Sequence, residues 1–199
     1  GEIKRLIINI APRHMKSLLV SVMWPCWEWG HYPGKRWIFA SYVDDVANKL
    51  SEDRRTLLTS EEYQKQFPGV VQLMPGQNAK SRFTNTRRGT MTAASFGGRI
   101  TGLGAHRIVV DDPTSPKEAD SLAERTAAND YFGKTLMNRL NQPAQDAVVI
   151  VMQRLHQDDV TGHLDNNDAY TRVVLPTIAE KDEVLVAPAA PDQEPVEVH

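Results

Sequence analysis

The chain has 199 residues, a formal net charge of −2, 41% hydrophobic residues and 24% charged residues, which are ordinary values for a globular domain. No run approaches the roughly 18 apolar residues that a membrane span requires, and no secretory signal segment is visible. The single cysteine, Cys26, excludes disulfide bonds within the chain and suits a reducing cytoplasm. The composition therefore excludes a membrane-spanning protein and a disulfide scaffold, and predicts one medium-sized domain with a sizeable core.

Charge is distributed unevenly along the chain. Residues 77 to 110 contain no acidic residue and six basic ones: Lys80, Arg82, Arg87, Arg88, Arg99 and Arg107. Two interpretations of this stretch remain open, an anion-facing surface and a solvated loop and strand face. From Glu180 onward acids and prolines dominate, which is typical of a linker or tail.

The first elements of the chain place a lysine and a serine at a helix start. The apolar run Leu6–Ile10 predicts a buried strand, and a five-residue loop, Ala11–Met15, follows it. Lys16 and Ser17 then open a helix whose predicted apolar face consists of Leu19, Val22, Met23 and Cys26. We also expect Trp24, Trp27 and Trp29 to pack in the core rather than to stack on a base, and Pro25 to kink this helix.

The remaining elements alternate between strands and helices. They are predicted in the order strand Arg36–Tyr42, helix Val43–Leu58, short helix Glu61–Phe67, a hairpin of Ser81–Thr86 and Thr90–Ser95, strand Arg107–Val110, a long helix from Ser115 to about Leu140, strand Ala147–Met152, a short helix near Asp158–Leu164 and strand Tyr170–Leu175. This alternation predicts an α/β fold with a mainly parallel central sheet and an inserted hairpin.

Two strands end in residues that suit nucleotide chemistry. The first strand leads into Lys16-Ser17, and strand Arg107–Val110 leads into Asp111-Asp112. Ligands of open α/β sheets bind at the carboxyl ends of the strands. A lysine with a hydroxyl at one strand end and carboxylates at another predict a site for a Mg²⁺–nucleotide, with ATP and Mg²⁺ as its ligands. The loop departs from the usual pattern, because Ile10 and Met15 occupy its two glycine positions.

At these residues the chain resembles the large subunits of bacteriophage terminases, the motors that package DNA into procapsids. The resemblance covers most of residues 3 to 175 and rests on Ala11-Pro12-Arg13-His14-Met15-Lys16-Ser17, Gly97-Gly98-Arg99-Ile100-Thr101-Gly102-Leu103-Gly104-Ala105, Ile108-Val109-Val110-Asp111-Asp112-Pro113 and the segment Met152 to Gly162. It implies a P-loop NTPase fold of the ASCE type, in which an extra strand separates the two nucleotide motifs.

The resemblance also implies roles for individual residues. The ATP-binding set is Pro12, Arg13, His14, Met15, Lys16 and Ser17. Lys16 would contact the β- and γ-phosphates, Ser17 and Asp111 would hold the metal, and Asp112 would activate water. Asp112 stands where many such ATPases have Glu, whose side chain reaches farther.

Other implied roles lie outside the loop and the carboxylates. Arg99 matches an arginine finger that acts in trans on a neighbouring subunit's nucleotide, and Gln153 matches the segment that couples loss of the γ-phosphate to DNA movement. Arg154 and His156 beside it are weaker candidates. The DNA-binding candidates are Lys80, Arg82, Arg87 and Arg88.

The expected assembly follows from the resemblance. We expect double-stranded DNA to be bound through its phosphate backbone without sequence specificity, with a portal and a small terminase subunit as further partners and no membrane. A homo-oligomeric ring is expected in the active state and a monomer in isolation, in the host cytoplasm at the portal vertex. Residues 1–176 are predicted to form an ATPase domain truncated at its N-terminus. Residues 177–199 would be a linker towards an absent nuclease domain, so that no nuclease activity is expected.

Two other functions remain open on the sequence. One is a helicase-like DNA-dependent ATPase. The other is a degenerate nucleotide-binding or assembly module without turnover, which the residues Ile10, Met15 and Asp112 at consensus positions favour.

Overall fold

The computed structural model describes residues 3–176, 185–187 and 196–198. Its main sheet contains β1 (Arg5–Ile10), β2 (Arg36–Ser41), β3 (Leu73–Asn78), β4 (Arg82–Asn85), β5 (Thr90–Ser95), β6 (Arg107–Asp111), β7 (Ala147–Met152) and β8 (Thr171–Leu175). Two short strands, β9 (Leu185–Ala187) and β10 (Val196–Val198), pair antiparallel in a separate ladder. Most of the predicted tail from residue 177 lies outside the described residues.

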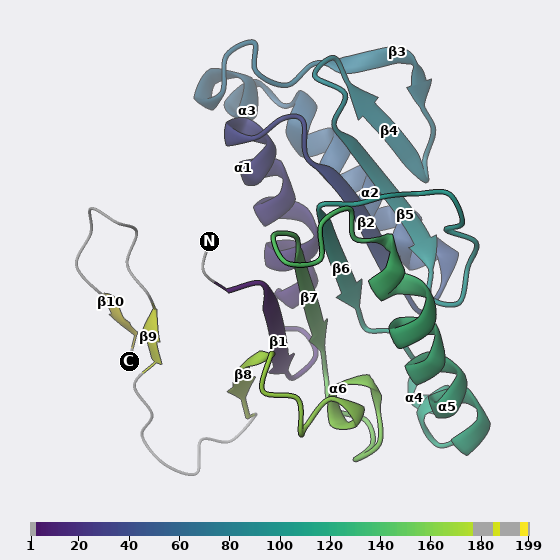
Figure 1. The fold of residues 1–199 in the computed structure, drawn as a ribbon. Coiled ribbons are helices and arrows are strands. Elements are labelled where there is room, and N and C mark those ends of the chain that lie inside the picture. Colours follow the sequence, from purple (N-terminus) through teal and green to yellow (C-terminus); the bar gives the residue numbers. More distant parts are fainter. Residues whose placement is uncertain (1–2, 177–184, 188–195, 199) are drawn as a thin grey trace.

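The main sheet has the order β3-β4-β5-β2-β6-β7-β1-β8. The strands from β5 to β8 run parallel, whereas β3 and β4 are antiparallel to their neighbours. In Figure 1 the arrowheads of β1, β2, β6 and β7 all point to the lower edge, so their carboxyl ends lie at one edge of the sheet. The predicted α/β class with a mainly parallel sheet and an inserted hairpin is confirmed.

The strand between the two nucleotide motifs is β7, which pairs with β1 on one side and β6 on the other. Strand β2, which lies between the two motifs in the chain, is on the far side of β6. The ends of β1 and β6 are therefore two strand positions apart, on either side of the end of β7.

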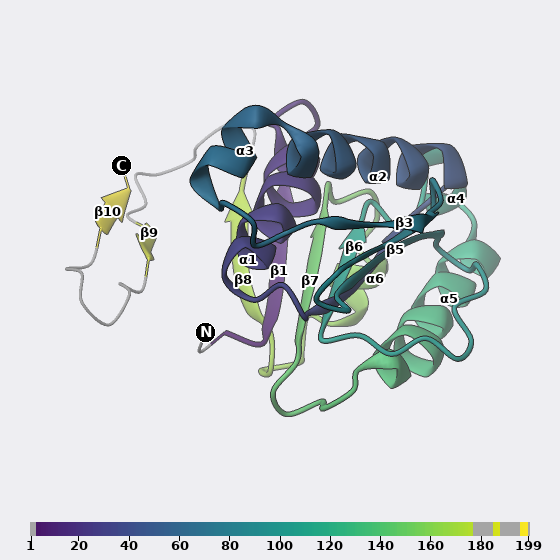
Figure 2. The same cartoon turned by 90° about the horizontal axis from the view of Figure 1, so that it is seen from above.

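Helices cover both faces of the sheet (Figure 2). They are α1 (Trp24–His31), α2 (Asp44–Thr59), α3 (Glu61–Gln66), α4 (Pro116–Ala119), α5 (Leu122–Asp130) and α6 (Val160–His163), with π-helical η1 (Leu18–Met23) and η2 (Tyr131–Leu136) and the 3₁₀ turn η3 (Met137–Arg139). None of the helices in the described part of the chain is long and apolar enough to cross a membrane.

The core is divided by the sheet into two clusters. Alternate residues of β2 face opposite sides: Trp37 and Phe39 pack with Trp29 of α1, whereas Ile38 packs with Phe132 of η2. Full burial of each such side chain contributes about 1.5–3 kcal/mol relative to leaving it exposed. The alternation explains why the central strands are apolar on both faces.

The predicted apolar face of the first helix is partly wrong. Leu19 is 50% exposed, Met23 47% and Trp27 55%, although Val22, Cys26 and Trp29 are buried as expected. The cause is η1, in which the Trp24 N–H bonds to the carbonyl of Leu19, five residues earlier. A wider turn rotates successive side chains differently from the 3.6-residue period on which the prediction rests.

The prediction of one uninterrupted helix after Ser115 is also wrong. Ser115 caps α4 with the expected capping box, but the chain leaves the helical conformation at Ser121, which caps a second helix, α5. The Arg125 guanidinium donates to the carbonyl of Ala119 at 2.7 Å and bridges the break. A second Ser-x-x-Glu pattern, at Ser121 and Glu124, was the available signal for this break.

Strand β3 has no counterpart in the predicted elements. It contains Pro75 and Gly76 and pairs only with β4, with a register shift between Leu73 and Asn78. A proline is tolerated there because an edge strand leaves one side without a ladder partner.

His106 gives the fold a testable pH dependence. Its Nδ1 accepts the backbone N–H of Arg36 at 3.0 Å. Burial lowers the pKa of His106, and the charges of Lys35, Arg36 and Arg107 act in the same direction. The folded state therefore binds fewer protons at this site than the unfolded state, so its contribution is present above the usual histidine pKa of about 6.5 and is lost as the pH falls.

We expect the free energy of unfolding, measured by urea denaturation between pH 8 and 5, to fall on acidification below about pH 6.5. His106→Asn, which can accept the same N–H without titrating, should flatten this dependence. The matched control is His163→Asn, at an exposed histidine. An unchanged pH profile in His106→Asn would contradict the assignment.

Candidate functional site

The loop between β1 and the first helix adopts a left-handed backbone at two residues that are not glycine. Arg13 has φ of 66° and Met15 has φ of 57°. Each costs about 1–3 kcal/mol of local strain, which glycine would avoid. Met15 thus takes a glycine-like conformation at the glycine position of the usual pattern, and its side chain is 65% exposed. The Met15 carbonyl accepts the N–H of Leu19 at 2.9 Å and begins the helix.

The other loop side chains are arranged around this turn. His14 folds back on the loop, with Nδ1 2.9 Å from the Pro12 carbonyl oxygen and 3.3 Å from that of Ala11. The Arg13 side chain is exposed and has no ion-pair or hydrogen-bond partner among the described residues. The loop therefore leaves one arginine available beside its backbone amides.

The two carboxylates at the end of β6 meet the loop residues that follow β1. Lys16 Nζ lies 2.7 Å from Asp112 Oδ2, with the two side chains 10% and 26% exposed. The Ser17 hydroxyl donates to Asp111 Oδ1 at 2.9 Å. The structure thus brings together the four predicted residues of the loop and the strand end.

Asp111 is the buried member of the carboxylate pair. It is 3% exposed, and burial raises its pKa while hydrogen bonds from Ser21 and Ser17 and the charge of Lys16 oppose this effect. A buried ionised carboxylate requires such donors. Asp111 is therefore held in one orientation between two hydroxyl groups.

Asp112 joins the ends of three strands. Its own N–H donates to Val151 of β7 at 3.0 Å, and its carbonyl accepts the N–H of Tyr42, just after β2, at 3.1 Å. Its Oδ1 accepts the N–H of Gln153 at 3.2 Å. Asp112 itself has φ of 46°, so its conformation is maintained by these neighbours. The predicted coupling residue Gln153 is consequently in direct contact with the carboxylate, through its backbone.

Sequence reasoning missed Ser21, whose hydroxyl donates to Asp111 Oδ2 at 2.5 Å. Ser21 lies four residues after Ser17, so one helix turn brings the two hydroxyls to one face. This spacing was a signal that the sequence contained.

Sequence reasoning also missed Arg54 of α2, which is fully buried. Pro25 has no N–H, so it cannot donate to the carbonyl of Ser21, four residues earlier. That carbonyl accepts from Arg54 Nη1 at 2.7 Å. The guanidinium carbon also lies 3.6 Å from the centre of the Phe39 ring. Burial lowers the pKa of Arg54 to about 9, and the charge of Asp111 opposes this shift.

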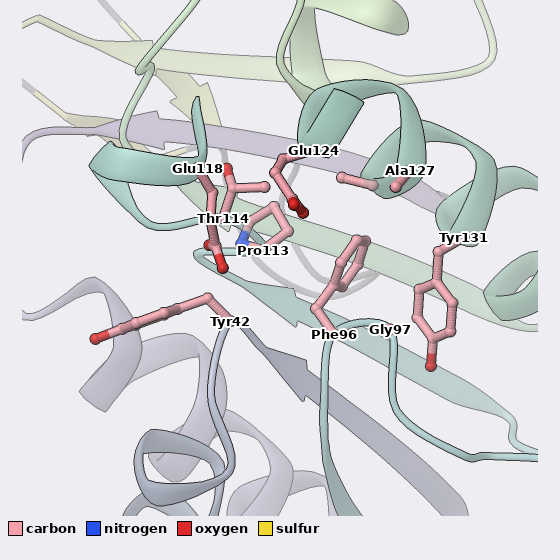
Figure 3. A pocket seen from close by; sticks show the side chains of 10 residues that line it. Tyr42, Phe96, Gly97, Pro113, Thr114, Glu118, Glu124, Ala127 and Tyr131 are labelled. Carbon is pink, nitrogen blue, oxygen red and sulfur yellow. The ribbon is translucent and has the colours of Figure 1, made fainter. Parts of the chain in front are cut away.

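Two cavities flank the site. One, of about 240 Å³, is lined by Pro12, Gln153 and Arg154, next to the loop. The other, of about 120 Å³, is shown in Figure 3; residues from both sides of the β6 end line it, among them Tyr42, Pro113 and Glu118. Gly97, from the glycine-rich loop that carries Arg99, also borders this second cavity.

Three candidates lie apart from the cluster. Arg99 is exposed, and among the described residues its side chain makes no hydrogen bond or ion pair with Lys16 or the carboxylates. Arg154 pairs with Asp159 at 3.2 Å, and His156 Nδ1 accepts the N–H of Asp158. Arg154 and His156 thus hold the turn that follows β7.

The residues at the loop and strand end fit a magnesium ion. Mg²⁺ takes oxygen ligands and usually binds through one or two protein side chains, with water and phosphate oxygens completing its shell. Ser17 Oγ and Asp111 Oδ1 offer two such oxygens on one side of the carboxylate. No group of three or more His, Cys, Asp or Glu residues suited to a metal occurs in the described ranges, so a metal held by protein side chains alone is not indicated there.

No protein-family model and no curated protein matches the chain. Solved structures do. The ATPase domain of the large terminase of Thermus phage P74-26, solved as a point mutant, matches with a TM-score of 0.61 and 12% identity over 88% of this chain and 77% of that one. The chain has the fold of a phage large terminase ATPase domain.

A second match is the large terminase of bacteriophage HK97, with a TM-score of 0.54, 14% identity and coverage of 90% of this chain. This chain spans 37% of the HK97 protein. At such low identity the two matches show the fold alone, and the roles of individual residues have to be argued from the geometry of the site.

The hydrogen bond from Ser21 to Asp111 should contribute measurably to the free energy of unfolding. We expect Ser21→Ala to lower the free energy of unfolding at pH 7 by about 1.5–3 kcal/mol, because a bond to a buried charged group is lost. The matched control is Ser51→Ala, since the buried Ser51 hydroxyl has no partner among the described residues. This control should cost less than about 1 kcal/mol, and equal losses in the two variants would contradict the role of Ser21.

Proposed function

We propose that this chain is the ATP-hydrolysing motor domain of a phage terminase large subunit, which drives double-stranded DNA into a procapsid. The supporting observation is the convergence of Lys16, Ser17, Asp111 and Asp112 at one edge of the sheet. That convergence occurs in a chain with the fold of terminase ATPase domains.

The loop and Lys16 would bind the triphosphate. The loop leads directly into the N-terminus of the first helix, and helix N-termini favour anions. Lys16 would neutralise the β- and γ-phosphates, and the exposed Arg13 would add charge at the γ-phosphate. Ser17 and Asp111 would hold Mg²⁺, which supplies charge neutralisation for phosphoryl transfer when bound.

Asp112 would orient and deprotonate the attacking water. In the structure it is paired with Lys16, so the incoming γ-phosphate must compete with Asp112 for the ammonium group. Once that pair opens, Asp112 Oδ2 is released toward the water while Oδ1 stays on the Gln153 N–H. A change at the γ-phosphate would in this way reach the segment after β7, which is the coupling role proposed for Gln153.

Arg99 would act in a ring of subunits. Arg99 is exposed, two residues after Gly97, which lines the cavity of Figure 3, and its guanidinium would be available to a neighbouring copy's nucleotide. An arginine finger of this kind raises the rate by roughly 10³–10⁵-fold. The partners proposed with this ring are double-stranded DNA, the portal and the small terminase subunit, in the host cytoplasm at the portal vertex.

A nucleotide-binding module without turnover is the second candidate, and the Lys16–Asp112 ion pair favours it. The 2.7 Å contact occupies both the phosphate-binding lysine and the proposed base. Turnover decides between the two functions. A helicase-like ATPase is distinguished from the motor by strand unwinding, which the motor would not show.

The Lys16–Asp112 pair yields opposite expectations for two variants. Lys16→Ala should weaken ATP binding by at least about tenfold and abolish turnover, because the phosphate charge loses its partner. Asp112→Asn should bind ATP as tightly as the wild type or tighter, because Lys16 is released, and should lose roughly 10²–10⁴-fold in turnover.

Binding is measured with a fluorescent ATP analogue, and turnover with DNA and procapsids present. Lys65→Ala, at an exposed pair on α3, is the control. Intact turnover in Lys16→Ala would overturn the site assignment, whereas absence of turnover in the wild type would favour the module.

The trans role of Arg99 is tested by mixing. Arg99→Ala and Lys16→Ala subunits should each be inactive alone, and an equimolar mixture should regain part of the turnover, because each supplies what the other lacks. If the mixture regains no turnover, and if turnover in mixtures with wild-type subunits rises in proportion to the wild-type fraction, a finger acting between subunits is contradicted.

A further inference from the structure

Three arginines converge on one cavity at the opposite edge of the sheet from the nucleotide site. The cavity, of about 210 Å³, is lined by Arg36, Arg82 and Arg88 together with Thr90, Thr92 and the glycine-rich segment Gly102–Gly104. Arg36 is the first residue of β2, and Arg88 lies in the turn just before β5, so the cavity lies at the amino ends of the parallel strands.

We propose that this cavity binds a backbone phosphate of double-stranded DNA. The proposal rests on the proposed motor function and names a site for its DNA. Of the four predicted DNA-binding residues it retains Arg82 and Arg88 and adds Arg36. It sets aside Lys80, whose ammonium group pairs with Glu52 at 3.0 Å, and Arg87, which does not line the cavity.

The cavity has the chemistry of an anion site. Arg36 comes from β2, and Arg82 and Arg88 come from the β4–β5 hairpin; none of the three guanidinium groups has a side-chain acceptor among the described residues. No acidic residue lines the cavity. The threonine hydroxyls are further donors, and a phosphate accepts from guanidinium groups in a two-pronged geometry.

The turn that carries Arg88 is built to hold it there. Arg88 has φ of 64°, a left-handed conformation that the side chain of Asn85 supports. Asn85 Oδ1 accepts the N–H groups of Arg87 and Gly89, both at 2.9 Å. Asn85 Nδ2 in turn donates to the carbonyl of Pro33 at 2.7 Å, so the turn is tied to the chain segment before β2.

Positive charge continues along the same edge, which favours a polymer over a small anion. A second cavity, of about 570 Å³, is lined by Lys4, Lys35 and His106 among others. Lys35 precedes Arg36, the first residue of β2, so both cavities lie at the amino end of that strand. One acid, Asp146, also lines the second cavity, and its carboxylate accepts the Gln142 N–H at 2.6 Å. Glu28 is paired with Arg107 at 2.7 Å. Several cations in a row suit the repeated charges of a nucleic-acid backbone.

The site also has a direct structural connection to the nucleotide edge. Strand β2 runs from Arg36 to Ser41, and Tyr42 immediately after it donates its N–H to the carbonyl of Asp112. A six-residue strand spans about 20 Å. One rigid element therefore links the proposed phosphate site with the carboxylate that faces ATP.

The test is binding of a fluorescein-labelled 30-base-pair duplex, followed by anisotropy over a range of salt concentrations. Arg36→Gln and Arg88→Gln should each weaken binding by roughly 3- to 10-fold, equally for two unrelated sequences, and should reduce the slope of log K against log salt by about 0.9 per lost contact. The control variants are Lys80→Gln and Lys65→Gln, both at residues already in ion pairs. Thermal melts confirm that these surface variants fold.

Wild-type affinity in Arg36→Gln and Arg88→Gln, or no duplex binding by the wild type, would overturn the proposal. Inorganic phosphate is the second probe. If phosphate binds in an Arg36-dependent manner and DNA does not, the cavity is a small-anion site and the assignment to DNA is wrong. Unchanged ATP binding in the arginine variants separates failure of this site from failure of the motor function, which the Lys16→Ala result addresses.

Discussion

The structure depends on one buried charge, the carboxylate of Asp111. A carboxylate that is 3% exposed must be compensated where it lies. The Ser17 and Ser21 hydroxyls donate to its two oxygens. The Arg54 guanidinium donates to the carbonyl of Ser21. This requirement fixes the first helix against β6 and α2, since all three must meet at one point. The π-helical segment η1 and Pro25, which follows it, allow the helix to present both serine hydroxyls to Asp111 and to leave the Ser21 carbonyl free for Arg54.

Asp112, the next residue, has a fixed backbone and a side chain that can change its partner. Its backbone is bonded to β7 and to the residue after β2, whereas its side chain is shared between Lys16 and the N–H of Gln153. Because the backbone of Asp112 is fixed while its side chain contacts both Lys16 and the Gln153 N–H, the side chain is suited to respond when Lys16 binds another group. The two adjacent carboxylates thus have different properties, because Asp111 is the last residue of the buried strand β6, whereas Asp112 lies just after the strand with a left-handed backbone.

The parallel sheet separates two kinds of chemistry onto its two edges. Carboxyl ends gather Lys16, Asp111 and Asp112, and amino ends gather the arginines of the cavity at Arg36. Parallel pairing imposes this separation, since all strands begin at one edge and end at the other. For the proposed motor function this geometry is useful, because a short strand such as β2 connects the two edges directly.

The sequence by itself determined the α/β class, the order of most strands and helices, and the loop and carboxylates that meet at the sheet edge. These follow from local periodicity and from the rule that parallel strands end together, so no contact needed to be known. Only the tertiary structure decided the edge strand β3 and the roles of Arg54 and Arg36. The two arginines depend on groups distant in the chain: the Ser21 carbonyl, left free by Pro25, for Arg54, and the turn that carries Arg88 for Arg36. Periodicity contains no information about such pairings, because they are set by the packing of whole elements.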